Sequence, residues 1–139
     1  MPVYNAEKFL AEAIDSILQQ SFSDFEFIII DDCSTDSSVA IIESYKDARI
    51  RLYRNNVNSG ISYSLNRGIE LATTELIARM DADDVSYPQR LQIQYDYLLA
   101  HPECAMVSSL ARMITEEKGV IRIDDFKSEL YYYNLTFSC

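Results

Sequence analysis

Carboxylates gather in one short stretch of the sequence, between Met80 and Pro88. Asp81, Asp83 and Asp84 lie close together there, in a chain whose net charge is already −10. Like charges at this spacing repel one another, so we expect a positive group to lie among them. Hard divalent cations prefer carboxylate oxygens, and Mg²⁺ is commonly held by one or two carboxylates together with the phosphates of a substrate. The stretch therefore predicts a metal site that serves a phosphate-bearing ligand.

A second acidic pair, Asp31 and Asp32, follows the apolar residues 25–30, just as the first group follows residues 75–80. Aspartates in loops usually face water, so an isolated Asp-x-Asp is weak evidence for a metal. Here both groups stand at the ends of predicted strands. Because ligands of parallel α/β sheets bind at the carboxyl ends of the strands, the two acidic groups are expected to open onto one edge.

The elements that must position these acids follow from hydrophobic periodicity. Helices are predicted over residues 5–20, 34–47, 58–72, 86–102 and 127–135, and strands over residues 25–30, 49–55 and 75–80. Residues 104–115 and 120–124 are predicted to form a hairpin around residues 116–119. The alternation of strand and helix predicts an α/β fold with a largely parallel sheet.

Local signals refine three of these helices. Asn5 is expected to cap the first helix, and Ser86 and Gln89 have the spacing of a capping box for the fourth. Gly68 lies inside the third helix, where it costs about 1 kcal/mol relative to alanine. We expect another group to approach it closely. The predicted apolar face of that helix comprises Ile61, Leu65, Ile69 and Ala72.

Composition limits the possible functions. The chain has 139 residues, 48% of them hydrophobic, which predicts one globular domain over residues 1–139. No apolar run reaches the roughly 18 residues of a membrane span. The charge of −10 disfavours nucleic acid as a partner. The three cysteines are far apart in sequence, which predicts neither a zinc site nor a disulfide framework and favours reduced thiols in the cytoplasm.

Four segments together resemble a known family. "MPVYNAEKFLAEAIDSIL", "FIIIDDCSTDSS", "NSGISYSLNRGIELA" and "IARMDADDVSYPQRLQIQ" occur in the order and at the spacing found in inverting family 2 glycosyltransferases of the GT-A fold. The resemblance covers approximately residues 1–110, the nucleotide-sugar-binding part. It implies a Rossmann-like, mostly parallel sheet with helices on both faces.

The resemblance also implies roles for individual residues. Asn5 and Asn58 would border the nucleotide, and Asp84 would share the metal if the motif is registered one residue later. The resemblance implies that Asp81 and Asp83 bind the metal ion, Mn²⁺ or Mg²⁺. The implied nucleotide-binding residues are Pro2, Val3, Tyr4, Glu7, Asp32, Gly60 and Asp81, with Asp32 contacting the base, commonly uracil.

The implied reaction is transfer of a sugar from a nucleotide-diphosphate sugar to an acceptor hydroxyl with inversion, in glycan or polysaccharide synthesis. The acceptor would be a glycan or a lipid-linked molecule, and the enzyme would be cytoplasmic, with the inner face of the membrane as one location. Family members carry the catalytic base beyond the position of residue 139. The chain is therefore expected to be a donor-binding portion, truncated at both ends, without the acceptor-binding part and inactive in isolation.

Two other interpretations stay open at the level of sequence. Asp31, Asp32 and Asp81 also fit a receiver-type phosphoacceptor domain, although no later hydroxyl residue and lysine complete that pattern, since Lys118 falls in the predicted hairpin turn. The other interpretation is a folded interaction module, in which the acidic side chains would simply face solvent. One departure from the glycosyltransferase pattern is Cys33, which stands where the family usually has glycine and would be strained at a positive φ.

Overall fold

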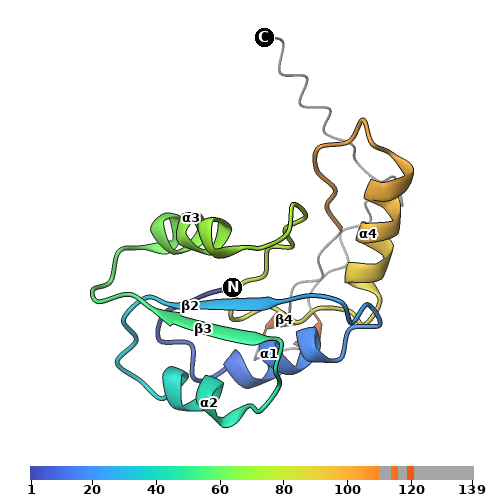
Figure 1. Cartoon of the computed structure of the whole chain (residues 1–139). Coiled ribbons are helices and arrows are strands. Elements are labelled where there is room, and N and C mark those ends of the chain that lie inside the picture. The colour runs from blue at the N-terminus through green and yellow to red at the C-terminus, as the bar shows by residue number, and fades with distance from the viewer. Residues whose placement is uncertain (110–113, 116–118, 121–139) are drawn as a thin grey trace. The chain divides into compact units, whose positions relative to one another are not determined.

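The computed structural model describes residues 1–109, 114–115 and 119–120 (Figure 1). The chain divides into two compact units, Met1–Leu91 and Gln92–Cys139. The helix predicted over residues 127–135 lies outside the described residues. The single domain over residues 1–139 stays a prediction.

The first unit is built on a parallel sheet. Its strands are β1 (Pro2–Val3), β2 (Phe27–Asp31) and β3 (Ile50–Arg54), and their order is β1-β2-β3. Val3 pairs with Asp31, which pairs with Arg54. The three strands therefore end in one row, and the residues that follow them leave from the same edge. The prediction of a parallel α/β sheet is confirmed.

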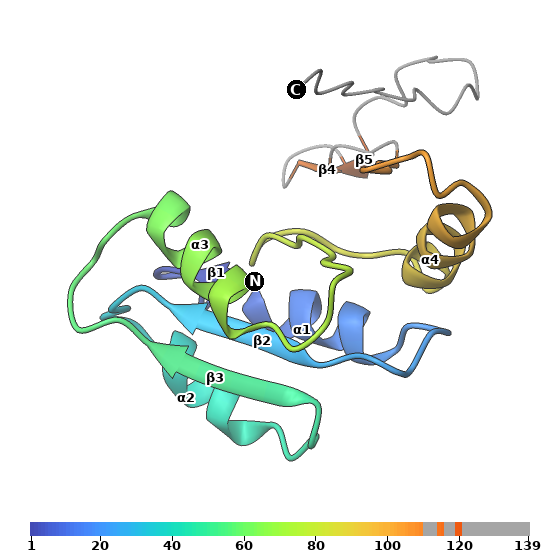
Figure 2. The ribbon, with the colours of Figure 1, turned by 45° about the horizontal axis from the view of Figure 1, so that its top comes forward.

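Helices cover both faces of this sheet, as predicted. α1 (Leu10–Leu18) and α2 (Ser38–Ser44) lie on one face and α3 (Ile61–Leu71) on the other (Figures 1 and 2). The core lies between α1, α2 and the strands, where burying each large aliphatic side chain contributes about 1.5–3 kcal/mol. Its buried members are Val3, Leu10, Ile14, Ile17, Phe27, Ile29, Ile42, Met80 and Ala82.

The first predicted cap is wrong. α1 begins at Leu10, and Asn5 has a left-handed backbone with φ of 49°. Its Oδ1 accepts hydrogen bonds from the backbone N–H and the hydroxyl of Thr35, at 2.8 and 3.3 Å. Asn5 therefore bonds to a distant loop instead of capping α1. Cys33 does have the positive φ, 65°, that its place in the family pattern suggested.

The predicted capping box before α4 (Arg90–Ala100) is also not formed. Ser86 precedes the helix by several residues, and its buried hydroxyl has no partner among the described residues. Gln20 holds this segment against the end of α1 instead. Its Nε2 donates to the carbonyl of Tyr87 at 2.8 Å, and its Oε1 accepts the N–H of Leu91 at 3.0 Å.

The apolar face predicted for α3 is not the face that packs on the sheet. Ile61 and Ile69 are 53% and 54% exposed, whereas Ser64 is fully buried. Gly68 approaches β2 as expected, since a Cβ built on it lies 3.7 Å from Cγ1 of Ile30. Small residues let the helix approach the strands closely, which hydrophobic periodicity alone does not reveal.

Replacing Gly68 with alanine is expected to raise the free energy of unfolding by about 0.5–1 kcal/mol, because the added methyl group makes an ordinary contact and helix propensity improves. Gly60→Ala is the matched control. Gly60 has φ of 85° and ψ of 164°, a region almost restricted to glycine, so about 1–3 kcal/mol should be lost. Urea unfolding measures both changes. Destabilisation by Gly68→Ala would mean that α3 lies closer to β2 than described.

Residues 75–80 do not form the predicted strand. No strand is assigned between α3 and α4, and Leu76 and Ile77 are exposed. A strand needs a neighbour for its backbone groups, and no ladder joins these residues to β1 in the described part of the chain. Only the end of the stretch, at Met80, enters the core.

The second unit contains most of α4 and a short hairpin. β4 (Ile114–Thr115) and β5 (Gly119–Val120) pair antiparallel around the predicted turn, whereas residues 104–109, predicted to belong to the first strand of the hairpin, form no strand. His101 stacks on Tyr97 at the end of α4, with 4.0 Å between ring centroids. Among the described residues of the chain, none of the helices has the length and apolar character needed to cross a bilayer.

Candidate functional site

The loops that follow β1 and β2 are fastened to each other. The N–H of Glu7 donates to the carboxylate of Asp36 at 3.0 Å, and the carboxylate of Glu7 accepts the N–H of Ser37 at 2.9 Å. Asp36 also accepts the N–H of Ser38 at 2.9 Å, at the start of α2. This reciprocal arrangement fixes the edge of the sheet where the family resemblance puts the nucleotide, and Glu7 contributes to it by binding backbone.

The short β1 segment presents one aromatic side chain at this edge. The side chain of Val3 is buried in the core, so only the backbone of Val3 can face a ligand at the sheet edge. Tyr4, the next residue, is 50% exposed. An exposed ring next to a fixed loop is suited to stacking on a planar ligand.

Asp32 lies just beyond β2 and is only 3% exposed. Its carboxylate accepts hydrogen bonds from Nδ2 of Asn55 at 2.6 Å, from the N–H of Ser59 at 3.0 Å and from the N–H of Gly60 at 2.7 Å. A carboxylate has about four acceptor positions, so most of them are already filled. Asp32 therefore holds residues 55–60 and the start of α3 in place.

The charge of Asp32 is stabilised by these donors. Burial alone would raise the pKa of Asp32, but hydrogen bonds from Asn55, Ser59 and Gly60 outweigh burial and hold the pKa below its usual value. The amide of Asn55 is oriented in turn by Arg67, whose Nη1 donates to Oδ1 of Asn55. Sequence reasoning missed Asn55 and interpreted Arg67 only as a surface or ion-pair residue, because the relation of both to Asp32 exists only in the folded chain.

The acidic turn is anchored by two apolar residues next to its carboxylates. Met80 and Ala82 are buried in the same hydrophobic cluster as Val3, whereas Asp81 is partly exposed and Asp83 is exposed. This alternation turns the acids out of the core, while Met80 and Ala82 share the core with Val3, the residue before Tyr4. That the acids and Tyr4 form one site stays a prediction.

Cations do lie near the crowded acids. Nη2 of Arg79 contacts both carboxylate oxygens of Asp81 at 2.8 Å. Burial, and then the negative charges of Asp81 and Asp83, raise the pKa of Asp84 above its usual value, while Arg79 and Arg90 act in the opposite direction. The carboxylates are therefore incompletely neutralised by the arginines.

Arg90 was missed by sequence reasoning. Burial lowers the pKa of Arg90, its Nη1 donates to the carbonyl of Arg79 at 3.3 Å, and its buried Nε has no partner among the described residues. The available signal was its position at the start of the helix that follows the acidic turn. A basic residue there lies close enough to influence Asp84.

Sequence comparison decides the family. The sequence model described as Glycosyl transferase family 2 matches residues 1–137 of the chain. The chain belongs to glycosyl transferase family 2. This assignment favours the glycosyltransferase interpretation over the receiver-type alternative.

Curated relatives support the assignment. O-antigen biosynthesis glycosyltransferase WbnJ of Escherichia coli is 36% identical over 137 residues, which are 96% of this chain and 51% of WbnJ. EpsE of Bacillus subtilis, named as a candidate glycosyltransferase, is 40% identical over 123 residues, which are 86% of this chain and 44% of EpsE. The family 2 chain thus spans about half the length of these relatives.

Solved structures of the GT-A fold resemble it as well. TarS of S. aureus, residues 1–349 in complex with UDP, matches with a TM-score of 0.73 and 27% identity, over 87% of this chain and 36% of TarS. The mannosyltransferase PcManGT of Pyrobaculum calidifontis, in complex with GDP-Man and Mn²⁺, matches with a TM-score of 0.72 and 28% identity, over 80% of this chain and 34% of PcManGT. The fold is therefore of the GT-A type.

The chemistry of the acidic turn fits a hard divalent cation. Within the described residues, no group of three or more His, Cys, Asp or Glu side chains is placed to share one metal ion. Mg²⁺ needs no such group, since one or two carboxylates with substrate phosphates and water complete its octahedron. Asp81 and Asp83 offer those two carboxylates.

Proposed function

We propose that this chain is the donor-binding part of an inverting glycosyltransferase that uses a nucleotide-diphosphate sugar, with UDP as the nucleotide. The observation that carries the proposal is that Met80 and Ala82, from the acidic turn, belong to the same buried cluster as Val3, the residue before Tyr4. A base-stacking residue and a pair of cation-binding carboxylates are thereby held by one core. Family membership and the neighbour solved with UDP support the same function.

The nucleotide would be held at the edge formed by β1 and β2. Tyr4 would stack on the base, and the remaining acceptor position of Asp32 would take a base N–H through a charge-assisted hydrogen bond. Backbone of Pro2 and Val3 would border the base, with Glu7 and Gly60 fixing the adjoining loops. Asp81 and Asp83 would hold Mn²⁺ or Mg²⁺, and Asp81 would also lie nearest the ribose.

The reaction follows from this placement. A hydroxyl of a glycan or lipid-linked acceptor attacks the anomeric carbon from the face opposite the diphosphate, so the configuration inverts. A general base removes the proton of that hydroxyl, and we assign the base to a part of the enzyme outside residues 1–139. The bound cation would neutralise the negative charge of the departing diphosphate. We place the reaction in polysaccharide synthesis, in the cytoplasm or at the inner face of the membrane.

Calorimetric titration tests donor binding without requiring the acceptor. UDP and GDP should be titrated into the chain with Mn²⁺ and again with excess EDTA. Saturable binding of UDP that requires the metal is expected, with weaker binding of GDP. Binding of neither nucleotide in the presence of Mn²⁺ would refute the proposal.

Replacing Arg79 with glutamine should strengthen metal binding. The guanidinium of Arg79 bonds both oxygens of Asp81, so a cation must displace it to use that carboxylate. Exposed ion pairs are worth up to about 1 kcal/mol, which corresponds to a few-fold lower Kd for Mn²⁺. Mn²⁺ titration followed by paramagnetic broadening measures it. Arg51→Gln, which breaks the pair with Glu26, is the control and should leave the Kd unchanged. Weaker Mn²⁺ binding by Arg79→Gln would mean that Arg79 supports the site.

A further inference from the structure

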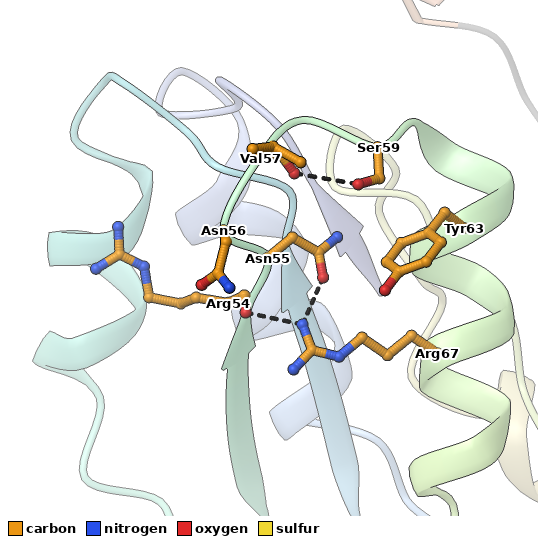
Figure 3. A pocket seen from close by; sticks show the side chains of 7 residues that line it. All are labelled: Arg54, Asn55, Asn56, Val57, Ser59, Tyr63 and Arg67. Carbon is orange, nitrogen blue, oxygen red and sulfur yellow. Dashed lines mark hydrogen bonds between the residues drawn. The ribbon is translucent and has the colours of Figure 1, made fainter.

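A pocket of about 350 Å³ opens at the carboxyl end of β3, beside the first turns of α3 (Figure 3). Its lining includes Asn56, Ser59, Tyr63 and Arg67. None of the residues assigned above to the sugar donor or the metal belongs to the lining. Two residues of the lining, Asn55 and Ser59, also donate to the carboxylate of Asp32, so the pocket adjoins the proposed donor site.

The pocket is locally positive in an acidic chain. Its described lining contains two arginines and neither aspartate nor glutamate, although the whole chain carries a net charge of −10. Arg54 turns its guanidinium away, and its Nε lies 3.4 Å from the carboxylate of Asp31 (Figure 3). Arg67 is consequently the charged group that faces the pocket.

Arg67 is held in place with donors to spare. Its Nη1 donates to the carbonyl of Arg54 at 2.8 Å and to Oδ1 of Asn55, which fixes the plane of the guanidinium. Within the described part of the chain, Nε and Nη2 make no hydrogen bond and no carboxylate pairs with Arg67. A fixed guanidinium with unused N–H groups matches the geometry of a carboxylate or phosphate.

Neutral donors complete the lining. Tyr63 is 54% exposed, and its hydroxyl lies on the pocket side of α3 (Figure 3). No hydrogen bond of the Tyr63 hydroxyl or of the Asn56 side-chain amide is found among the described residues. Both groups are thus available to a ligand that also contacts Arg67.

We propose that this pocket binds the phosphate or carboxylate group of a small molecule other than the sugar donor, with Arg67 as its charged anchor and Tyr63 and Asn56 as neutral donors. Small-molecule sites commonly enclose about 300–1,000 Å³, so the volume admits a sugar-sized body beside the anionic group. The binding requires no divalent cation, because Arg67 supplies the positive charge.

The test uses inorganic phosphate and glucuronate as probes, with glucose as the neutral comparison, all in excess EDTA. Two-dimensional NMR of the ¹⁵N-labelled chain should show saturable shifts for residues 54–67 with an anion and none with glucose. Saturation by phosphate alone or by glucuronate alone identifies the preferred group and supports the proposal. Absence of saturable shifts with both anions overturns it.

Variants assign the anchor. Arg67→Gln should weaken anion binding by about tenfold or more, because charge-assisted hydrogen bonds are lost. Lys46 follows α2, and α2 and α3 lie on opposite faces of the sheet (Figure 1). Lys46→Gln removes the same charge and should change the affinity by less than about twofold. Tyr63→Phe removes only an exposed hydroxyl, so it should fold normally and still weaken binding. Unchanged affinity in both Arg67→Gln and Tyr63→Phe would overturn the assignment.

A variant of the acidic turn separates this site from the donor site. Asp83→Ala should lose metal-dependent binding of UDP but retain anion binding at Arg67. Loss of both together would show that the pocket belongs to the donor site and would refute a second ligand. If UDP fails to bind the unaltered chain while phosphate or glucuronate still saturates residues 54–67, the donor proposal fails and this one stands.

Discussion

Replacing Asp32 with alanine is expected to lower the free energy of unfolding by about 1–3 kcal/mol. The carboxylate is buried, and its removal leaves the N–H groups of Ser59 and Gly60 and the amide of Asn55 without their acceptor. A buried donor left unsatisfied costs about 1–3 kcal/mol, and this cost applies to Asn55, which is buried, whereas Ser59 and Gly60 are exposed and their N–H groups can bond to water. Urea unfolding followed by circular dichroism measures the loss.

Asp83→Ala serves as the matched control for that loss. Asp83 is exposed, so its replacement should change the free energy of unfolding by no more than about 0.5 kcal/mol. Equal stability of the Asp32 and Asp83 variants would mean that residues 55–60 do not depend on Asp32 for their conformation.

The stabilisation from Asp32 also depends on pH. Its folded-state pKa lies below that of the unfolded chain, so its contribution is fully present above about pH 4 and is lost as pH falls through the folded-state pKa. Asp32→Asn should remove this part of the acid dependence, and a series of urea titrations between pH 2 and pH 7 would detect the difference. An identical acid dependence in Asp32→Asn and the unaltered chain would contradict the assignment.

The second large effect concerns the metal. Asp83→Ala is expected to weaken metal-dependent binding of UDP by about a hundredfold or more, because the proposed cation would lose one of two protein ligands. Calorimetric titration of UDP with Mn²⁺ measures the change. Glu70→Ala removes one negative charge from an exposed position of α3 and should leave the affinity unchanged.

The same experiment decides the register of the motif. If Asp84→Ala abolishes binding while Asp83→Ala does not, the cation is held one residue later than proposed. Loss in both variants would indicate that the two carboxylates share the ion.

The sequence predicted the elements whose signals are local. β2 and β3 consist largely of β-branched, aromatic and apolar residues, and both occur where periodicity put them. Residues 75–80 are also partly apolar, but they contain one β-branched residue and no aromatic, lack a paired neighbour in the described chain, and are not a strand. Composition indicates the capacity to pair, whereas pairing itself depends on a second segment.

The same distinction, between signals that are local in sequence and contacts with distant segments, applies to the candidate site residues. The acidic turn was found from spacing alone, because crowded carboxylates are visible in the sequence. The contribution of Asp32 to residues 55–60 was not found, because its donors come from another loop. Asn5 and Ser86 were assigned as caps from local spacing, yet Asn5 binds Thr35 and the backbone of Ser86 binds Ser16. Both residues therefore form hydrogen bonds with partners far away in sequence.

The packing of Met80 and Ala82 has a consequence for genetics. Met80 and Ala82 are the sequence neighbours of the carboxylates proposed to bind the cation. Both belong to the same buried apolar cluster as Ile14 and Ile17 of α1. Repacking that cluster would displace the acids without altering any of them. A random-mutagenesis screen for weakened donor binding should therefore recover substitutions in α1 beside those in the turn itself.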